Sequence, residues 1–155
     1  MSDMELTLSR EIAASPELVW AVVTDLDRAP EICSGIARVE RLAGPAYDVG
    51  TRWRETRTML GREATEEMEV VGLEPGRSAT LAAEAHGVVY RSVLRVEPSG
   101  AGTLLSMSFA GTLESPSWLQ RAAATLTSRM GLAATRRVMR QDLDDIAAYA
   151  ERVGG

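Results

Sequence analysis

Two glutamates, Glu55 and Glu66, are predicted to lie directly opposite each other on neighbouring β-strands. Segments 53–59 and 62–70 flank Leu60-Gly61, an arrangement typical of a hairpin whose two-residue turn contains a glycine. Residues paired across a hairpin point to the same face of the sheet, so this register brings the two carboxyl groups together. Such a pair offers an acid and a base in one place, as proton-transfer chemistry requires.

Arg57 shares this face, and Tyr90 from a second hairpin is expected beside it. Two charged carboxylates in a dry site repel each other. We therefore expect Arg57 to bridge them, water to fill the space, or one carboxyl group to keep its proton with a raised pKa. The alternative is that both glutamates lie near an open strand end and are solvated. The candidate catalytic residues are Glu55, Glu66, Arg57 and Tyr90.

Other residues on the same face suit either a protein core or the wall of a ligand site. The register pairs Trp53 with Met68, and the second hairpin, 78–85 with 88–97, pairs Ala83 with Tyr90. The predicted ligand-binding residues are Trp53, Met68, Ser92, Leu105, Met107 and Phe109 on the strands, and Leu126, Met130 and Ala134 on a helix.

The elements that position these residues follow a simple order along the chain. Ser15-Pro16 is a helix start signal, because serine caps the helix and proline suits its first position. Ser115-Pro116 repeats this signal before a long amphipathic segment. The expected elements are strands 4–12, 36–42, 53–59, 62–70, 78–85, 88–97 and 103–112, short helices after Pro16 and over 27–33, and a helix over 116–153.

Antiparallel strands with one apolar face need a cover, and the only large amphipathic element available is the C-terminal helix. The sequence therefore predicts an α+β fold in which a curved antiparallel sheet of about seven strands wraps around that helix. The length of 155 residues, without repeats or linkers, predicts one domain over 1–155.

Composition excludes several classes of protein. A net charge of −5 argues against nucleic-acid binding, which depends on clustered cations. Cys33 is the only cysteine and His86, in a predicted turn, the only histidine, so we expect no disulfide, no metal site and an exposed His86. The chain lacks an export signal and an apolar run of the roughly 18 residues that cross a membrane, which predicts a cytoplasmic protein without integral membrane association.

Five short motifs, in this order and spacing, carry a family resemblance. They are Ala14–Trp20, Asp25–Asp27 with Pro30, Gly50–Trp53, Val70–Arg77 and Gly102-Thr103. Over almost its whole length the chain resembles the START-like or birch-pollen-allergen-like superfamily, and within it the polyketide cyclase/dehydrase and lipid-transport group, also called SRPBCC proteins. Ile32-Cys33 departs from the family pattern, which has a tryptophan shortly after the proline, so an aromatic wall of the cavity mouth is expected to be missing.

The resemblance implies a helix-grip fold with a cavity between sheet and helix that holds a small apolar molecule, aromatic, polyketide-like or lipid. It implies no cofactor, and a monomer or homodimer. Cofactor-free chemistry of the cyclase or dehydratase type is one expected function. The alternative is a non-enzymatic carrier of hydrophobic ligands, or a protein-interaction module.

Overall fold

The computed structural model describes residues 4–44, 46–59, 61–85, 88–113 and 129–155. Its strands are β1 (Met4–Ile12), β2 (Ile36–Ala43), β3 (Arg52–Met59), β4 (Arg62–Glu74), β5 (Ser78–Ala85), β6 (Val88–Ser99) and β7 (Gly102–Leu113). Its helices are α1 (Pro16–Val23), α2 (Ala29–Ile32) and α4 (Arg129–Gly154).

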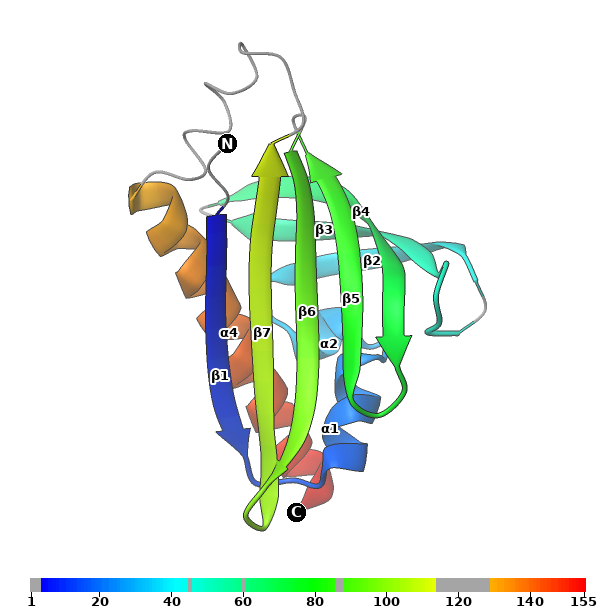
Figure 1. Ribbon diagram of the computed structural model, residues 1–155, viewed down its shortest axis with the longest axis vertical. Coiled ribbons are helices and arrows are strands. Elements are labelled where there is room, and N and C mark those ends of the chain that lie inside the picture. The colour runs from blue at the N-terminus through cyan, green and yellow to red at the C-terminus, as the bar shows by residue number, and fades with distance from the viewer. Residues whose placement is uncertain (1–3, 45, 60, 86–87, 114–128) are drawn as a thin grey trace.

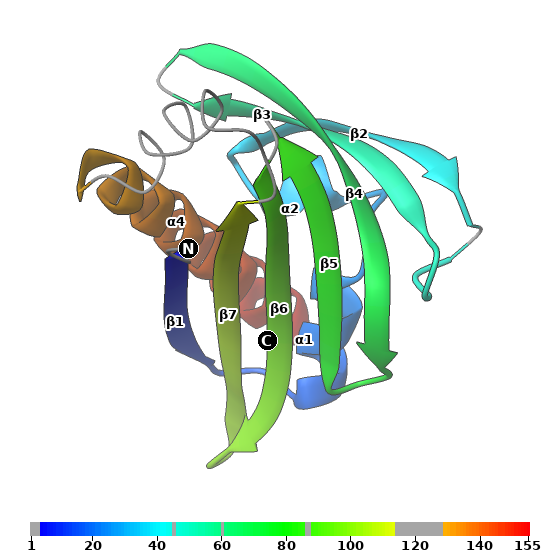
Figure 2. The ribbon, with the colours of Figure 1, turned by 45° about the horizontal axis from the view of Figure 1, so that its top comes forward.

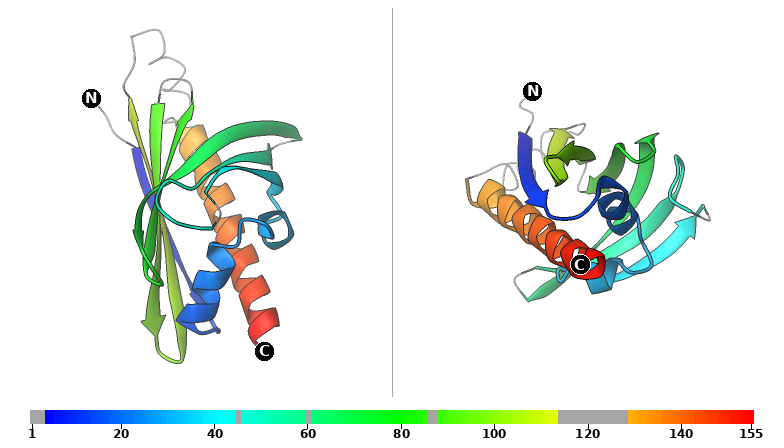
Figure 3. Two further views of the ribbon diagram at one scale, coloured as in Figure 1. Left: turned by 90° about the vertical axis from the view of Figure 1, so that its right-hand side faces the viewer. Right: turned by 90° about the horizontal axis from the view of Figure 1, so that it is seen from below.

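The seven strands form one antiparallel sheet in the order β1-β7-β6-β5-β4-β3-β2. The sheet is strongly curved, and β2, β3 and the upper part of β4 bend over the helices (Figures 1 and 2). Helices α1, α2 and α4 lie on its concave side, which we call the inner face (Figure 3). The predicted α+β helix-grip fold, with two short helices after the first strand, is confirmed.

The first short helix begins where the sequence predicted. Ser15 accepts a hydrogen bond from the Leu18 backbone N–H at 3.2 Å, and Pro16 occupies the first turn of α1. The helix ends at Val23, so Leu26 lies beyond it yet is still buried. Helix α2 is shorter than the predicted 27–33, because it covers only Ala29–Ile32.

Both hairpins adopt the predicted registers. Gly61 has a φ of 76°, the left-handed conformation that a tight turn of this kind requires. The side chains of paired residues therefore share the expected faces. The confirmed pairs are Trp53 with Met68, Glu55 with Glu66, and Ala83 with Tyr90.

The main core fills the lower part of the inner face. Helix α4 contacts β1, β7, α1 and α2, and its residues Leu143 and Ile146 pack between Ile12, Val19 and Leu105. A second, smaller cluster lies further up the curve of the sheet. Its members are Leu26, Trp53, Val70 and Leu81.

Some predictions lie outside the described residues. These are the helical range 116–128 with Leu126, the side chain of Met130, and the exposure of His86. Within the part of the chain that the structure describes, no helix is long and apolar enough to cross a lipid bilayer.

Gly102 at the start of β7 provides a test of how β1 and β7 meet. A Cβ atom at this position would lie 2.3 Å from the carbonyl oxygen of Ile12, closer than atoms can approach. The atoms nearest to this Cβ belong to the backbone of Ile12, so they cannot turn away as a side chain can. We therefore expect Gly102→Ala to lower the free energy of unfolding by about 2 kcal/mol or more, measured by urea denaturation. The exposed neighbour Ala101, changed to Ser, is the control and should unfold like the wild type.

Candidate functional site

Arg57 is the centre of a buried polar network on the inner face. Its Nε donates a hydrogen bond to Glu55 Oε2 at 2.7 Å. Its Nη1 and Nη2 donate to the two carboxylate oxygens of Asp142 on α4, at 3.2 Å and 2.7 Å. Trp53 Nε1 donates to the other oxygen of Glu55 at 3.4 Å. The network therefore joins three successive inward-facing residues of β3 to the C-terminal helix.

Because this network is buried, each of its charged groups needs its partners. The side chains of Asp142, Glu55 and Arg57 are only 9 %, 15 % and 23 % exposed. Burial alone lowers the pKa of a guanidinium, but the carboxylates of Asp142 and Glu55 hold the pKa of Arg57 above its ordinary value. Burial raises the pKa of Asp142, and Arg57 opposes that rise. Arg57 is therefore a fixed positive charge whose donors are directed at two carboxylates.

Asp142 is a site residue that the sequence analysis missed. It lies between Met139 and Ile146, both buried, and so falls on the apolar stripe of α4. A single acid within such a stripe is a detectable signal, since a carboxylate on a buried helix face needs a partner. The sequence pattern does not show which residue is that partner, because Arg57 is 85 positions earlier in the chain.

The loop between α2 and β2 covers the ion pair. A methyl group on Gly35 would lie 3.4 Å from Arg57 Nη1. The backbone N–H and hydroxyl of Ser34 both donate to Asp145 of α4, at 2.9 Å and 2.7 Å. Cys33 is buried, and burial together with the nearby Asp142 carboxylate raises the pKa of its thiol. This cysteine therefore stays protonated and is a poor nucleophile.

Glu66 lies opposite Glu55 as predicted, but the two do not form a dry pair. Glu66 is exposed, while Glu55 is half-buried and bonded to Arg57. Of the three arrangements expected for the pair, the bridge by Arg57 is not formed, since Arg57 bonds to Glu55 and Asp142. Glu66 is exposed because it lies on the part of β4 that extends beyond the small core cluster.

Tyr47, which the sequence analysis did not select, packs beside this network. Its ring centroid is 6.0 Å from that of Trp53, with the planes tilted by 36°. Burial and then the Glu55 carboxylate raise the pKa of its hydroxyl. Tyr47 therefore adds an aromatic wall to the Trp53 side of the inner face.

Tyr90 is a further buried residue with a polar group on this face. The residue is 7 % exposed, and its ring stacks on Phe109 with centroids 5.1 Å apart and planes at 17°. Among the described residues, no atom forms a hydrogen bond with its hydroxyl. Burial and then the Glu66 carboxylate raise the pKa of this phenol, so it is a neutral donor near pH 7.

The predicted ligand-binding residues whose side chains the structure describes fall into three groups by burial. Leu105 is 0 % exposed within the main core, so it offers no surface to a ligand, and Trp53 is 2 % exposed. Ala134 is exposed on α4. The remaining residues on the strands face inward yet stay half-buried. They are Met68, Ser92, Met107 and Phe109.

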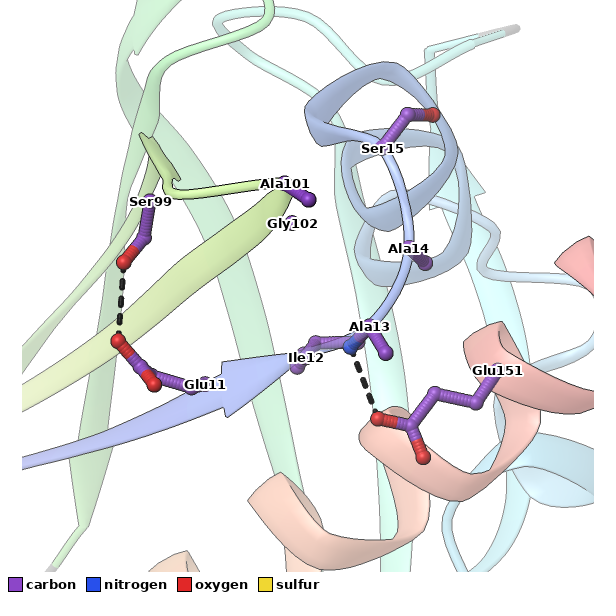
Figure 4. Close-up of a pocket in the computed structure, with 9 residues that line it drawn as sticks. All are labelled: Glu11, Ile12, Ala13, Ala14, Ser15, Ser99, Ala101, Gly102 and Glu151. Atoms are coloured by element: carbon purple, nitrogen blue, oxygen red, sulfur yellow. Dashed lines mark hydrogen bonds between the residues drawn. The ribbon is translucent and has the colours of Figure 1, made fainter.

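A pocket of about 450 Å³ opens at the opposite end of the molecule (Figure 4). It lies between the end of β1, the start of α1, the β6–β7 turn and the last turns of α4. Its polar groups bond to one another, Ala13 N–H to Glu151 at 2.9 Å and the Ser99 hydroxyl to Glu11 at 2.9 Å. None of the predicted site residues lines it, and Ser99 is about 30 Å along β6 from Tyr90.

Comparison with known proteins agrees with this architecture. The family described as polyketide cyclase / dehydrase and lipid transport matches residues 3–151. No curated protein matches the sequence.

Solved structures share the fold at low sequence identity. Zhui aromatase/cyclase from Streptomyces sp. R1128 has a TM-score of 0.81 and 19% identity, covering 97% of this chain and 95% of that one. A START superfamily protein from Mycobacterium smegmatis has a TM-score of 0.77 and 14% identity, covering 96% and 98%. Major latex-like protein 151 from Panax ginseng has a TM-score of 0.77 and 14% identity, covering 96% and 97%.

The ion pair between Arg57 and Asp142 can be tested by stability. Asp142→Leu leaves a buried guanidinium with one carboxylate in place of two, and we expect it to lower the free energy of unfolding by about 2–4 kcal/mol. The control replaces all three charged groups together, as E55Q/R57M/D142L. Because no buried charge is then left unpaired, the triple variant should be more stable than the single one. Urea denaturation of both measures this, and a less stable triple variant would contradict the account.

Proposed function

The chain belongs to the polyketide cyclase/dehydrase and lipid transport family, and we propose that it binds a small apolar molecule on the inner face of its sheet, beside Tyr90. The proposal rests on the partial exposure of several residues that face inward. Met68, Ser92, Met107 and Phe109 point to the same side as the closed core, yet retain accessible surface. An apolar surface that is both inward-facing and accessible is suited to bind an apolar ligand.

The character of this surface favours an aromatic ligand. Phe109 and Tyr90 provide stacked rings, and Met68 and Met107 provide polarisable sulfur atoms that interact well with aromatic groups. The Streptomyces protein of similar fold is named an aromatase/cyclase, and this name supports a polyketide-like compound as the ligand class. The non-enzymatic alternative is a carrier for the same kind of molecule.

Dye binding tests the proposal without knowledge of the natural ligand. N-phenyl-1-naphthylamine is an uncharged aromatic dye that fluoresces in apolar sites. Ser92→Phe places a bulky ring on the inner face, and we expect it to weaken dye binding by about tenfold or more, since occupied volume excludes the ligand. Fluorescence titration measures the dissociation constant.

Val93→Phe is the matched control for this experiment. Val93 is the next residue of β6, is also half-buried, and points to the outer face. It should bind the dye like the wild type. Equal loss in both variants would indicate a general effect on folding, and no dye binding by the wild type would remove the proposal.

Proton transfer on a bound polyketide-like substrate is the second candidate function. One feature of the strand register favours it: Glu66 lies two residues before Met68 on β4, on the same face as Tyr90, and Met68 and Tyr90 both pair with Ala83. An accessible carboxylate and a neutral phenol would then act as base and acid. Glu55 and Arg57 are less suited to proton transfer, because each is held by buried partners.

Glu66→Gln tests whether this pair is coupled. Removing the negative charge should lower the pKa of Tyr90, since the nearby anion disfavours the phenolate, and should leave the affinity for the dye unchanged. NMR titration of tyrosine labelled with ¹³C at Cζ follows this pKa. Glu67→Gln, one residue along and on the outer face, is the control and should leave the pKa unchanged. If Glu66→Gln also leaves it unchanged, the acid–base hypothesis loses its basis.

A further inference from the structure

The Tyr90 hydroxyl is a buried donor whose partner is not found among the described residues. With the residue 7 % exposed, bulk water does not readily replace that partner. A buried polar group without a hydrogen bond is unfavourable, so natural proteins place one where something else satisfies it. On a ligand-binding surface, the ligand itself is the candidate.

The direct neighbours of Tyr90 on the adjacent strands are small residues. They are Ala83 on β5 and Gly111 on β7, the second of which has no side chain. The ring of Tyr90 therefore has no bulky neighbour directly across either strand, and it stacks on Phe109 instead. Met68 continues the same row beyond Ala83. An aromatic ligand can extend this platform by stacking or by contact with the thioether.

The charges nearby select against an anionic group at this point. Glu66 lies on the same face of β4, two residues before Met68, and Met68 pairs with Ala83, the direct neighbour of Tyr90. A ligand carboxylate bound at the Tyr90 hydroxyl would therefore lie on the same face as this like charge. Two inward-facing arginines are already occupied. Arg57 bonds to Glu55 and Asp142, and Arg10 of β1 pairs with Asp144 of α4.

We infer that Tyr90 is the polar anchor of the ligand site: its hydroxyl donates a hydrogen bond to an uncharged oxygen, a carbonyl or a hydroxyl, of a flat aromatic ligand. This inference rests on the proposed function, because it requires a ligand on the inner face. It narrows the ligand class to neutral oxygenated aromatic compounds, and it disfavours fatty-acid anions.

Three probes of one shape separate the hydrogen bond from the shape of the site. Naphthalene has no oxygen, 2-naphthol has a neutral hydroxyl at neutral pH, and 2-naphthoate has a carboxylate. Displacement of N-phenyl-1-naphthylamine gives the affinity of each probe for the wild type and for Tyr90→Phe. Tyr149→Phe, on α4 beside Arg152, is the matched control for loss of a tyrosine hydroxyl.

We expect Tyr90→Phe to weaken the binding of 2-naphthol about tenfold and to change the affinity for naphthalene by less than about twofold, because only 2-naphthol accepts the hydrogen bond. The wild type should bind 2-naphthoate about tenfold more weakly than 2-naphthol. Tyr149→Phe should behave like the wild type with all three probes. Urea denaturation shows whether each variant is folded.

Other results would overturn the inference. Equal losses for naphthalene and 2-naphthol would mean that Tyr90 acts through shape alone, and no loss for either would mean that its hydroxyl is satisfied elsewhere. Binding of 2-naphthoate as tight as that of 2-naphthol would disprove the selection for a neutral oxygen, with exposed Arg62 on the same face as a source of positive charge. If the wild type binds the dye but none of the probes, the inference is wrong while the proposed function stands. If even the dye fails to bind, the proposed function is wrong.

Discussion

A guanidinium on the inner face of a curved sheet constrains the rest of this structure. Arg57 cannot be deprotonated, so its burial requires carboxylates within hydrogen-bond distance. Glu55 supplies one from the same strand, because residues two apart share a face. Asp142 supplies the other from α4, with both oxygens engaged. A position of α4 that left Arg57 without Asp142 would bury an incompletely paired charge, so this contact helps to fix where the helix crosses the sheet.

The path of α4 then divides the inner face into two parts. Where the helix packs on β1, β7 and α1, Leu143 and Ile146 close a dense core around Leu105. Further along the same strand, Met107 and Phe109 keep accessible surface. The closed part stabilises the fold, and the accessible part offers a surface for a ligand. Tyr90 lies in the second part, where its buried hydroxyl is a specific polar feature on an apolar wall.

The register of both hairpins was predictable because it depends on local features. A two-residue turn with a glycine fixes which residues are opposite each other, and strand alternation then fixes their faces. Glu55, Arg57, Glu66 and Tyr90 were placed on one face by this argument alone. The bonding among them was not predictable in the same way. Arg57 bonds to Asp142 and not to Glu66, and this bonding depends on the position of α4, a helix far along the chain.

Local sequence patterns therefore specify the order of the elements, the antiparallel pairing and the residues that face inward. These follow from periodicity, turn residues and helix start signals, which act over a few positions. Which inward-facing residues are buried and which are accessible depends on the packing of distant elements, as Leu105 and Met107 show, two positions apart on β7. The same packing also decides the partner of each buried charge. The reason is physical: burial and ion pairing depend on what packs against a face, and that contact joins segments that the local pattern cannot relate.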